Sequence, residues 1–285
     1  LINLLKITSN KEFTKNIKDF SEKIISIHIV VCKTAIDLSM FKNKKFLNLK
    51  ELTLVSDKIE DISTLHYCEF PVLEILSLGD NKIGNSIIDL LEKLILPELT
   101  LLNLYSNNIT DIKLFEVIKK FEKLKHFFAG ENQFEINKNP KDFYEFPKSL
   151  EEFGLTGNLE GDRCQFIKRL DISNLKIFYI SRNKIDNLSY IENIKFKRLE
   201  NFYSFRNNIT DINEILKIQD RENLKIIDLR ENKINNFNEL INIISFFPKL
   251  ERLNIRNNTE INEAQIKEMK NKLKEKYKRK LDFLF

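Results

Sequence analysis

Apolar residues recur along the chain in a short pattern with a nearly constant period. The pattern is L-x-x-L-x-L-x-x-N, with other apolar residues often replacing Leu, and its copies are spaced 22 to 26 residues apart. Self-similarity at such a period is typical of proteins whose repeats stack into a solenoid. Eleven copies follow the pattern, and they begin at Ile2, Ile24, Leu49, Leu73, Leu99, Leu124, Leu150, Leu175, Leu199, Leu224 and Leu250.

Within each copy, two apolar positions alternate with other residues, which predicts a short β-strand. Leu102 and Leu104 should point to the same buried face, because successive side chains alternate across a strand. One such strand is too short to bury its face alone, so neighbouring strands must stack into a continuous parallel sheet. A second apolar set follows each strand, as at Ile109, Phe115 and Ile118, and its spacing predicts helical or 3-10 return segments of about two turns.

The ninth position of the pattern is almost always Asn. Nine of the eleven copies have Asn there, and Cys32 and Asp57 replace it in the other two. An Asn at the end of a strand turns the chain, and its amide can bond to backbone groups of adjacent coils that would otherwise be unsatisfied. We therefore expect a ladder of buried Asn side chains along the array.

Three stretches carry a family resemblance: they read LTLLNLYSNNITDI at 99–112, LKIIDLRENKINNF at 224–237 and FPKLERLNIRNN at 247–258. They resemble the leucine-rich-repeat family, and the likeness covers residues 2–262. The N-x-I-x-x-I spacing is similar to the intracellular phosphatase-regulator-like subtype. The resemblance implies an α/β fold, a right-handed horseshoe or arc with about eleven parallel inner strands, helical or 3-10 segments on the convex side, and a concave sheet face that binds partners. Strands should centre on residues such as Leu102, Phe178 and Leu253.

The two ends of the chain differ from its middle. We expect a repeat array over 1–262 and a basic C-terminal capping helix over 263–285, with Ile266, Met269 and Leu273 facing inward. No capping segment precedes the first repeat, which indicates a fragment or a lost cap. The formal net charge is +5, and the last 23 residues hold most of it. The nearly neutral body argues against a nucleic-acid groove along the whole array, although the basic helix itself is either a docking patch or a solvated cap face.

Signatures of catalysis are missing from the sequence, which has no phosphate-binding loop, no dinucleotide-binding glycine motif, no H-E-x-x-H and no C-x-x-C. The three histidines are too far apart along the array to share a metal ion; they are His28, His66 and His126. We therefore expect no enzymatic activity, no cofactor, no metal and no small-molecule substrate.

Cysteine usage and apolar run length bear on the compartment. The cysteines are three in number and widely separated, which favours a reducing compartment; they are Cys32, Cys68 and Cys164. Apolar runs such as 87–96 are short and interrupted by charges, so no membrane span is expected. We expect a cytoplasmic location, with the nucleus as the alternative.

The third, fifth and seventh residues of each copy should point out of the concave face, with the eighth at its rim. In the later copies these positions hold five of the ten arginines of the chain, and from Ile24 onward they hold no Lys. Arg offers a planar fork for carboxylate or phosphate, and Arg and Tyr are enriched at binding hot spots. The predicted partner-binding residues are Phe128, Tyr179, Arg182, Tyr203, Phe205, Arg206, Arg230, Arg252 and Arg256. The acidic residues of earlier copies at these positions are Glu51, Asp80, Glu131 and Glu152.

These observations favour a non-enzymatic protein-protein interaction scaffold or adaptor, whose partner is an acidic or phosphorylated protein. One alternative is a component of an RNA-protein particle that contacts RNA through the tyrosines and arginines. Another is a regulatory subunit of a phosphatase or ubiquitin ligase. A plainer interpretation stays open as well, in which the arginines pair with Asp228 and Glu231 and form a ladder that serves only the fold.

Overall fold

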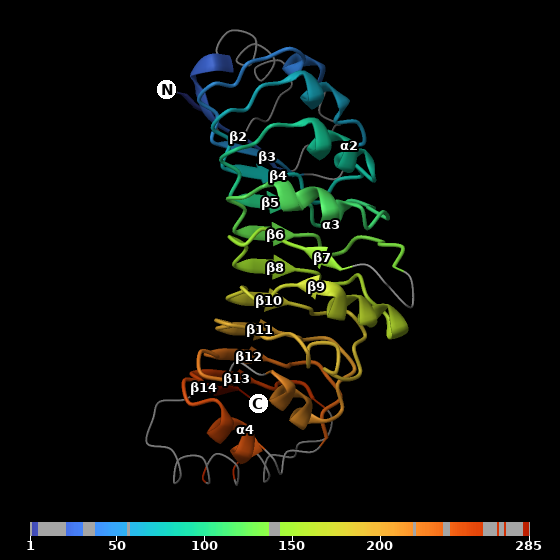
Figure 1. The fold of residues 1–285 in the computed structure, drawn as a ribbon, viewed down its shortest axis with the longest axis vertical. Coiled ribbons are helices and arrows are strands. Elements are labelled where there is room, and N and C mark those ends of the chain that lie inside the picture. The colour runs from blue at the N-terminus through green and yellow to red at the C-terminus, as the bar shows by residue number, and fades with distance from the viewer. Residues whose placement is uncertain are drawn as a thin grey trace. The chain divides into compact units, whose positions relative to one another are not determined.

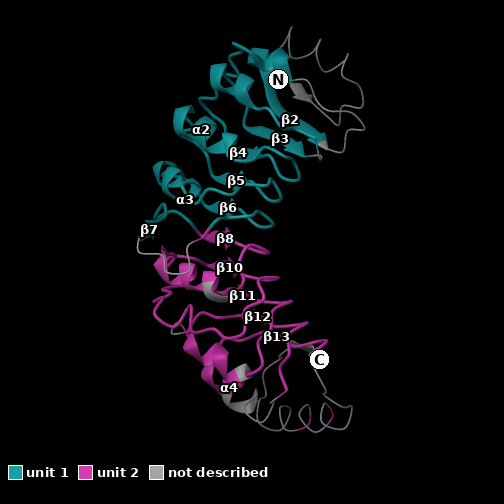
Figure 2. Ribbon diagram, turned by 90° about the vertical axis from the view of Figure 1, so that its right-hand side faces the viewer, with its two compact units in different colours: residues 1–135, 144–150 teal, residues 136–143, 151–285 magenta. Residues whose placement is uncertain are grey.

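The computed structural model describes residues 2–4, 21–30, 38–55, 58–136, 143–218, 221–235, 240–258, 267, 271 and 282–284. The chain divides into two compact units (Figure 2). Unit 1 comprises Leu1–Glu135 and Tyr144–Leu150, and unit 2 comprises Ile136–Phe143 and Glu151–Phe285. Each unit contains stacked coils of one short strand and one return segment.

Unit 1 forms a parallel sheet in which the strands follow one another in chain order (Figure 1). Register pairs place the fourth residue of each copy side by side, from Ile27 through Leu52, Leu76 and Leu102 to Phe127. The strands are β1 (Ile2–Leu4), β2 (Ile24–Val30), β3 (Glu51–Val55), β4 (Ile75–Ser77), β5 (Leu101–Asn103) and β6 (His126–Phe128). The remaining elements are η1 (Ser21–Lys23), η2 (Leu38–Phe41), η3 (Ser63–Tyr67), α2 (Ser86–Lys93), α3 (Leu114–Val117), η4 (Ile118–Lys120) and β7 (Tyr144–Glu145).

Unit 2 repeats the arrangement. Its fourth-position residues pair from Phe153 through Phe178, Phe202 and Ile227 to Leu253. The strands are β8 (Glu152–Gly154), β10 (Ile177–Tyr179), β11 (Asn201–Tyr203), β12 (Ile226–Asp228), β13 (Arg252–Asn254) and β14 (Asp282–Leu284). The remaining elements are η5 (Gly161–Arg169), β9 (Leu170–Asp171), η6 (Ile212–Lys217) and α4 (Leu240–Phe246). The expected short helical return segments are therefore present in both units.

The structure departs from the sequence-based expectation at the C-terminal end. A capping helix was predicted over 263–285, but residues 282–284 form a strand, parallel to β13, that places Phe283 opposite Leu253. A last repeat strand without a neighbour would leave a row of unpaired backbone groups, and β14 satisfies them. Residues 267 and 271 are helical, and the rest of the predicted helix lies outside the described residues.

The core is built from the positions that the repeat pattern assigns to it. Leu102 and Leu104 are both completely buried, which confirms that they share the inward face of their strand. In the first three coils of unit 2 the fourth position is Phe, and the ring centroids of Phe153 and Phe178 lie 6.0 Å apart, followed by Phe178 and Phe202 at 6.2 Å. These rings form a continuous apolar column through neighbouring coils.

The predicted Asn ladder is also present. The Nδ2 of Asn132 donates to the carbonyl oxygen of Leu104 in the preceding coil at 3.0 Å, while its Oδ1 accepts from the amides of Asn107 and Ile109, each at 3.0 Å. Asn183 does the same in unit 2, where it donates to the Leu155 oxygen at 2.9 Å. Because these amides are buried, their hydrogen bonds stabilise the packing of each coil against the one before it.

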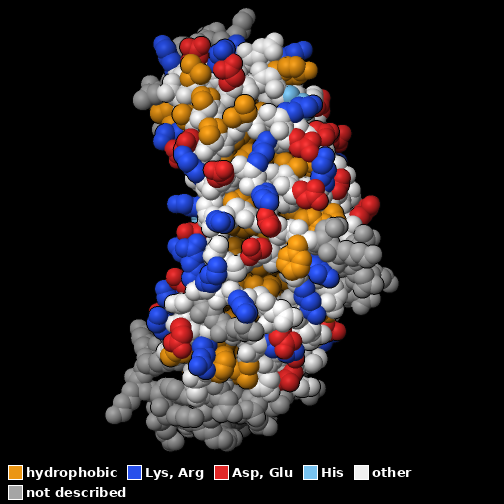
Figure 3. All heavy atoms as spheres, in the orientation of Figure 1, with side chains coloured by type: hydrophobic (Ala, Val, Ile, Leu, Met, Phe, Trp, Pro, Cys, Tyr) orange, Lys and Arg blue, Asp and Glu red, His pale blue; other side chains and the backbone are white. Residues whose placement is uncertain are grey.

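A ladder of ion pairs accompanies the apolar stack. At the second repeat position, Lys and Glu of consecutive coils pair, as in Lys50–Glu74 at 2.7 Å, Lys176–Glu151 at 3.0 Å and Lys225–Glu200 at 2.6 Å. Figure 3 accordingly shows basic and acidic side chains interspersed over the face in view. Each exposed pair of this kind contributes little stability. Because Lys and Glu alternate at this position in these neighbouring coils, however, the pairs favour the correct neighbouring coil.

Candidate functional site

Eight of the nine predicted partner-binding residues belong to unit 2, where they lie on β10 to β13 or directly after these strands. Phe128 is the exception, because it ends β6 of unit 1 and is half-buried there. The unit 2 sheet face is defined here as the eight residues Tyr179, Arg182, Tyr203, Phe205, Arg206, Arg230, Arg252 and Arg256. The tyrosines, Phe205 and Arg230 are half-buried, and the other four arginines are exposed.

Two stacked tyrosines form the centre of this face. Tyr179 and Tyr203 pair in register on β10 and β11, and their rings are stacked with centroids 4.7 Å apart and planes inclined by 10°. Burial raises the pKa of both phenols. The charge of Glu152 and a hydrogen bond to it raise the pKa of Tyr179 further. The negative charge of Asp228 raises the pKa of Tyr203 further. The pair is therefore neutral at physiological pH and forms a preordered flat surface.

Beside the tyrosines, Arg230 is held by an aromatic ring and a carboxylate. Its guanidinium carbon lies 4.6 Å from the ring centroid of Phe205, and its Nε lies 3.3 Å from Oδ2 of Asp228. The backbone amide of Arg230 also donates to Oδ1 of Asp228 at 3.1 Å. These contacts fix the guanidinium plane, which reduces the entropy that Arg230 would lose on binding a ligand.

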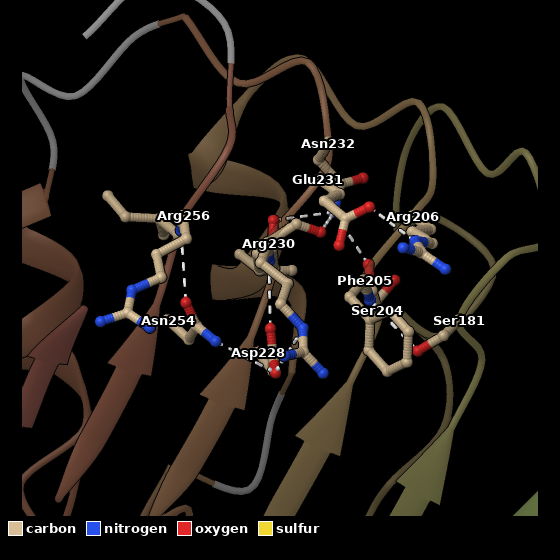
Figure 4. A network of polar contacts seen from close by, with 12 residues as sticks. Ser181, Ser204, Phe205, Arg206, Asp228, Arg230, Glu231, Asn232, Asn254 and Arg256 are labelled. Atoms are coloured by element: carbon tan, nitrogen blue, oxygen red, sulfur yellow. Dashed lines mark hydrogen bonds and ion pairs between the residues drawn. The ribbon is translucent and has the colours of Figure 1, made fainter. Parts of the chain in front are cut away.

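Asp228 is the most buried charged residue of this network, since only 7% of it is exposed. Burial raises the pKa of its carboxyl group, although the Arg230 amide, the Arg230 charge and a hydrogen bond from Asn254 act in the opposite direction. The Nδ2 of Asn254 donates to Oδ2 of Asp228 at 3.3 Å, and its Oδ1 accepts from the Arg256 amide at 3.3 Å. Figure 4 shows this chain of contacts running across β11, β12 and β13.

Arg206 pairs with Glu231 of the next coil, with Nε 2.6 Å from Oε2. Both residues occupy the eighth repeat position and have positive φ angles of 55°. This backbone conformation disfavours side chains such as Arg, so Arg at this position is not selected by the turn itself. Arg182 has the same backbone, with a φ of 58°.

The plainer interpretation thus applies to Arg206 and Arg230, whose carboxylate partners are Glu231 and Asp228. Arg256 differs: its guanidinium has no ion pair or hydrogen bond within the part of the chain that the structure describes. Asn254 was absent from the predicted set. The signal that could have found it is its fifth position, which it shares with Tyr179, Tyr203 and Asp228.

Unit 1 carries different chemistry at the equivalent positions. The fifth-position residues of β3, β4 and β5 are Thr53, Ser77 and Asn103, and Asn103 donates to the Ser77 hydroxyl at 3.2 Å. His28 lies with Nε2 3.0 Å from Oε2 of Glu51. These small polar groups of β3 to β5 bond within the face, and the outward aromatic side chains of unit 1 include Tyr105 after β5 and Phe128 on β6.

The coil geometry of the two units decides the architecture, because successive copies, 22 to 26 residues apart, each contribute one parallel strand, and nine of the eleven have Asn at the ninth position. The fold is a leucine-rich-repeat solenoid. Among solved structures, the chain is similar to internalin C2 of Listeria monocytogenes, with a TM-score of 0.39, 21% identity and coverage of 70% of this chain and 69% of that one. It is also similar to a leucine-rich-repeat protein of Leptospira interrogans, with a TM-score of 0.49, 20% identity and coverage of 100% and 81%. No family model matches the sequence.

Other kinds of site are not evident in the described residues. No group of three His, Cys, Asp or Glu side chains among them is arranged to hold a metal ion. Cys68 is buried, and desolvation raises the pKa of its thiol to about 12, so it is not an activated nucleophile. None of the described helices combines the length and apolarity needed to cross a membrane.

Proposed function

We propose that the chain is a non-enzymatic protein-interaction scaffold and that the unit 2 sheet face binds its partner. The observation that carries the proposal is the stacked Tyr179–Tyr203 pair with preordered Arg230 beside it. Rigid aromatic and arginine side chains lose little conformational entropy on binding and dominate the energetics of protein interfaces. The alternating buried and outward positions of the strands let these residues change without disturbing the core.

A protein partner fits this face better than RNA does. Single-stranded RNA would stack on the tyrosines and pair with arginines, but Asp228 and Glu231 lie among those arginines and already engage two of them. Carboxylates in this position repel a phosphate backbone. A role as a phosphatase or ubiquitin-ligase subunit differs from the main proposal only in the identity of the partner.

The test is affinity capture from a lysate of the source organism, followed by mass spectrometry. Tyr203→Ala combined with Arg206→Ala should weaken partner binding by about 2 kcal/mol or more, which is the usual hot-spot threshold. The matched control combines Tyr67→Ala with Arg221→Ala, which removes an exposed Tyr and an exposed Arg from elsewhere on the chain. If the first variant melts normally and still captures every partner, the proposed site is wrong.

Salt dependence separates the protein partner from RNA. Binding that rests on many phosphate contacts falls steeply with salt, whereas a mixed protein interface gives a shallow dependence. A steep slope together with nuclease-sensitive capture would favour the RNA alternative.

A further inference from the structure

We infer that the unit 2 sheet face recognises a partner segment by a single carboxylate group, which binds between Arg230 and Arg256. The inference rests on the proposed function and specifies the chemistry of the partner. It predicts an extended protein segment with one Asp or Glu and, a few residues away, a flat apolar side chain.

The two arginines offer unused hydrogen-bond donors in adjacent coils. They share the seventh repeat position, and the amide of Glu231 donates to the Arg256 oxygen at 2.8 Å, which fixes the two coils side by side. Phe205 and Asp228 hold the Arg230 guanidinium, yet within the described chain its two terminal nitrogens donate no hydrogen bond. The exposed guanidinium of Arg256 has no carboxylate partner there either.

The groups between the two arginines are already satisfied. Oδ1 of Asp228 accepts from the Arg230 amide, and Oδ2 accepts from Asn254, whose own oxygen accepts from the Arg256 amide. Figure 4 shows Asp228 and Asn254 between the two guanidinium groups. An incoming anion therefore meets the terminal nitrogens of the arginines, which can bind a carboxylate in the bidentate manner that Arg favours.

Charge balance selects a carboxylate over a phosphate. The residues labelled in Figure 4, which do not include Arg182 and Arg252, comprise three arginines (Arg206, Arg230 and Arg256) and two carboxylates (Asp228 and Glu231) besides uncharged groups, so the formal charge of this group is +1. One carboxylate from the partner brings this to zero. A phosphate monoester carries about −1.5 to −2 and would leave excess negative charge next to Asp228 and Glu231.

Geometry sets the distance between the acidic and the flat group. Tyr203 lies in β11, two coils before Arg256, and two positions earlier in the repeat. With about 4.8 Å between strands and about 3.3 Å per residue along them, the two sites are roughly 12 Å apart. An extended segment covers that distance in about three or four residues.

The experiment uses the whole chain as a fluorescent probe against immobilised position-scanning octapeptide libraries. The peptides are acetylated at the N-terminus and amidated at the C-terminus, so that no terminal charge competes with the fixed residue. Each position is fixed in turn as Glu, Gln, Lys or phosphoserine. For the wild-type chain, Glu should be preferred over Gln and over phosphoserine by about tenfold at one position. Arg256→Gln should abolish that preference, whereas the matched Arg221→Gln variant should keep it.

Several results would overturn the inference. They are a preference for phosphoserine, equal binding of Glu and Gln, the absence of peptide binding by the wild-type chain, and binding of a 12-nucleotide oligouridine that Arg256→Gln removes. These results are distinct from a failure of the proposed function. If the combined Tyr203→Ala and Arg206→Ala variant loses its captured partners while the libraries show no Glu preference, protein binding stands and only the carboxylate is wrong.

Discussion

The face of β3 to β5 in unit 1 and the face of β10 to β12 in unit 2 have the same strand register and different surface chemistry. In β3 to β5 of unit 1 the fifth position holds Thr53, Ser77 and Asn103, whose polar groups bond within the face. In unit 2 the same position holds the stacked Tyr179 and Tyr203, then the carboxylate of Asp228. Small polar groups that already bond to one another contribute little binding free energy. Stacked rings and fixed guanidinium groups contribute more when a partner buries them.

The comparison shows that separate residues specify the fold and the surface. The fourth and ninth positions are the same in kind in both units, since Leu102 and Phe178 are fully buried and Asn107 and Asn183 bond to the preceding coil. The outward positions differ without changing the register. Substitutions at the two kinds of position should therefore have separable effects.

The largest effect is expected for adjacent residues of one strand. Phe178→Ala should lower the free energy of unfolding by about 3 to 5 kcal/mol, because it opens a cavity in the aromatic column. Tyr179→Ala, one residue later and outward, should cost about 1 kcal/mol, mainly from the lost ring stacking. Denaturant titration of both variants checks the difference, and similar losses would show that the outward residues also hold the fold.

The next effect concerns binding and compares the two units. Combining Thr53→Ala with Asn103→Ala on the unit 1 face should change the affinity for the captured partner by less than about 0.5 kcal/mol, since neither residue has the character of a hot spot. Tyr203→Ala with Arg206→Ala should cost about 2 kcal/mol or more. Titration calorimetry with the captured partner measures both, and a larger loss in unit 1 would move the site there.

The sequence was sufficient for the repeat register, because the period-two alternation recurs from copy to copy and nine of the eleven copies have Asn at the ninth position. It also placed Tyr179 and Tyr203 in neighbouring coils, where they stack. Neither step needs side-chain detail. Both follow from a translation that carries each repeat position onto the next.

The sequence was not sufficient to predict which neighbours the Arg230 side chain would contact. Arg230 could have faced solvent, but a ring on one side and Asp228 on the other hold it against the face. The choice depends on rotamers and on the burial of Asp228, which repeat spacing does not specify. Similarly, the apolar end of the chain carried no marker that residues 282–284 would form β14.

Substitutions in the Asn ladder should have a smaller effect on the free energy of unfolding. They test whether the Asn side chains bond adjacent coils to each other in the same way in both units. Asn132→Ala should cost about 1 to 3 kcal/mol, because it strands buried backbone groups of two coils. Asn258→Ala should cost less, since Asn258 is only partly buried and water can replace its bond to the Leu229 oxygen. Denaturant melts of the two variants measure the costs, and equal, negligible losses would show that the amides are solvated.

The smallest effect is the pH dependence that Asp228 of unit 2 contributes. Burial raises the pKa of Asp228 above its ordinary 3.8, so the folded state holds this proton more tightly than the unfolded chain does. Stability from this group is therefore complete below pH 3.8 and falls as the pH rises through the folded pKa. Asp228→Asn cannot titrate, so the free energy of unfolding of the variant should gain on that of the wild type as the pH rises from about 3.5 to 7. Parallel denaturant melts across this range measure the gap, with Thr53→Ala as a control that leaves every titrating group in place. A gap that stays constant with pH would mean that Arg230 and Asn254 compensate the burial of Asp228 completely.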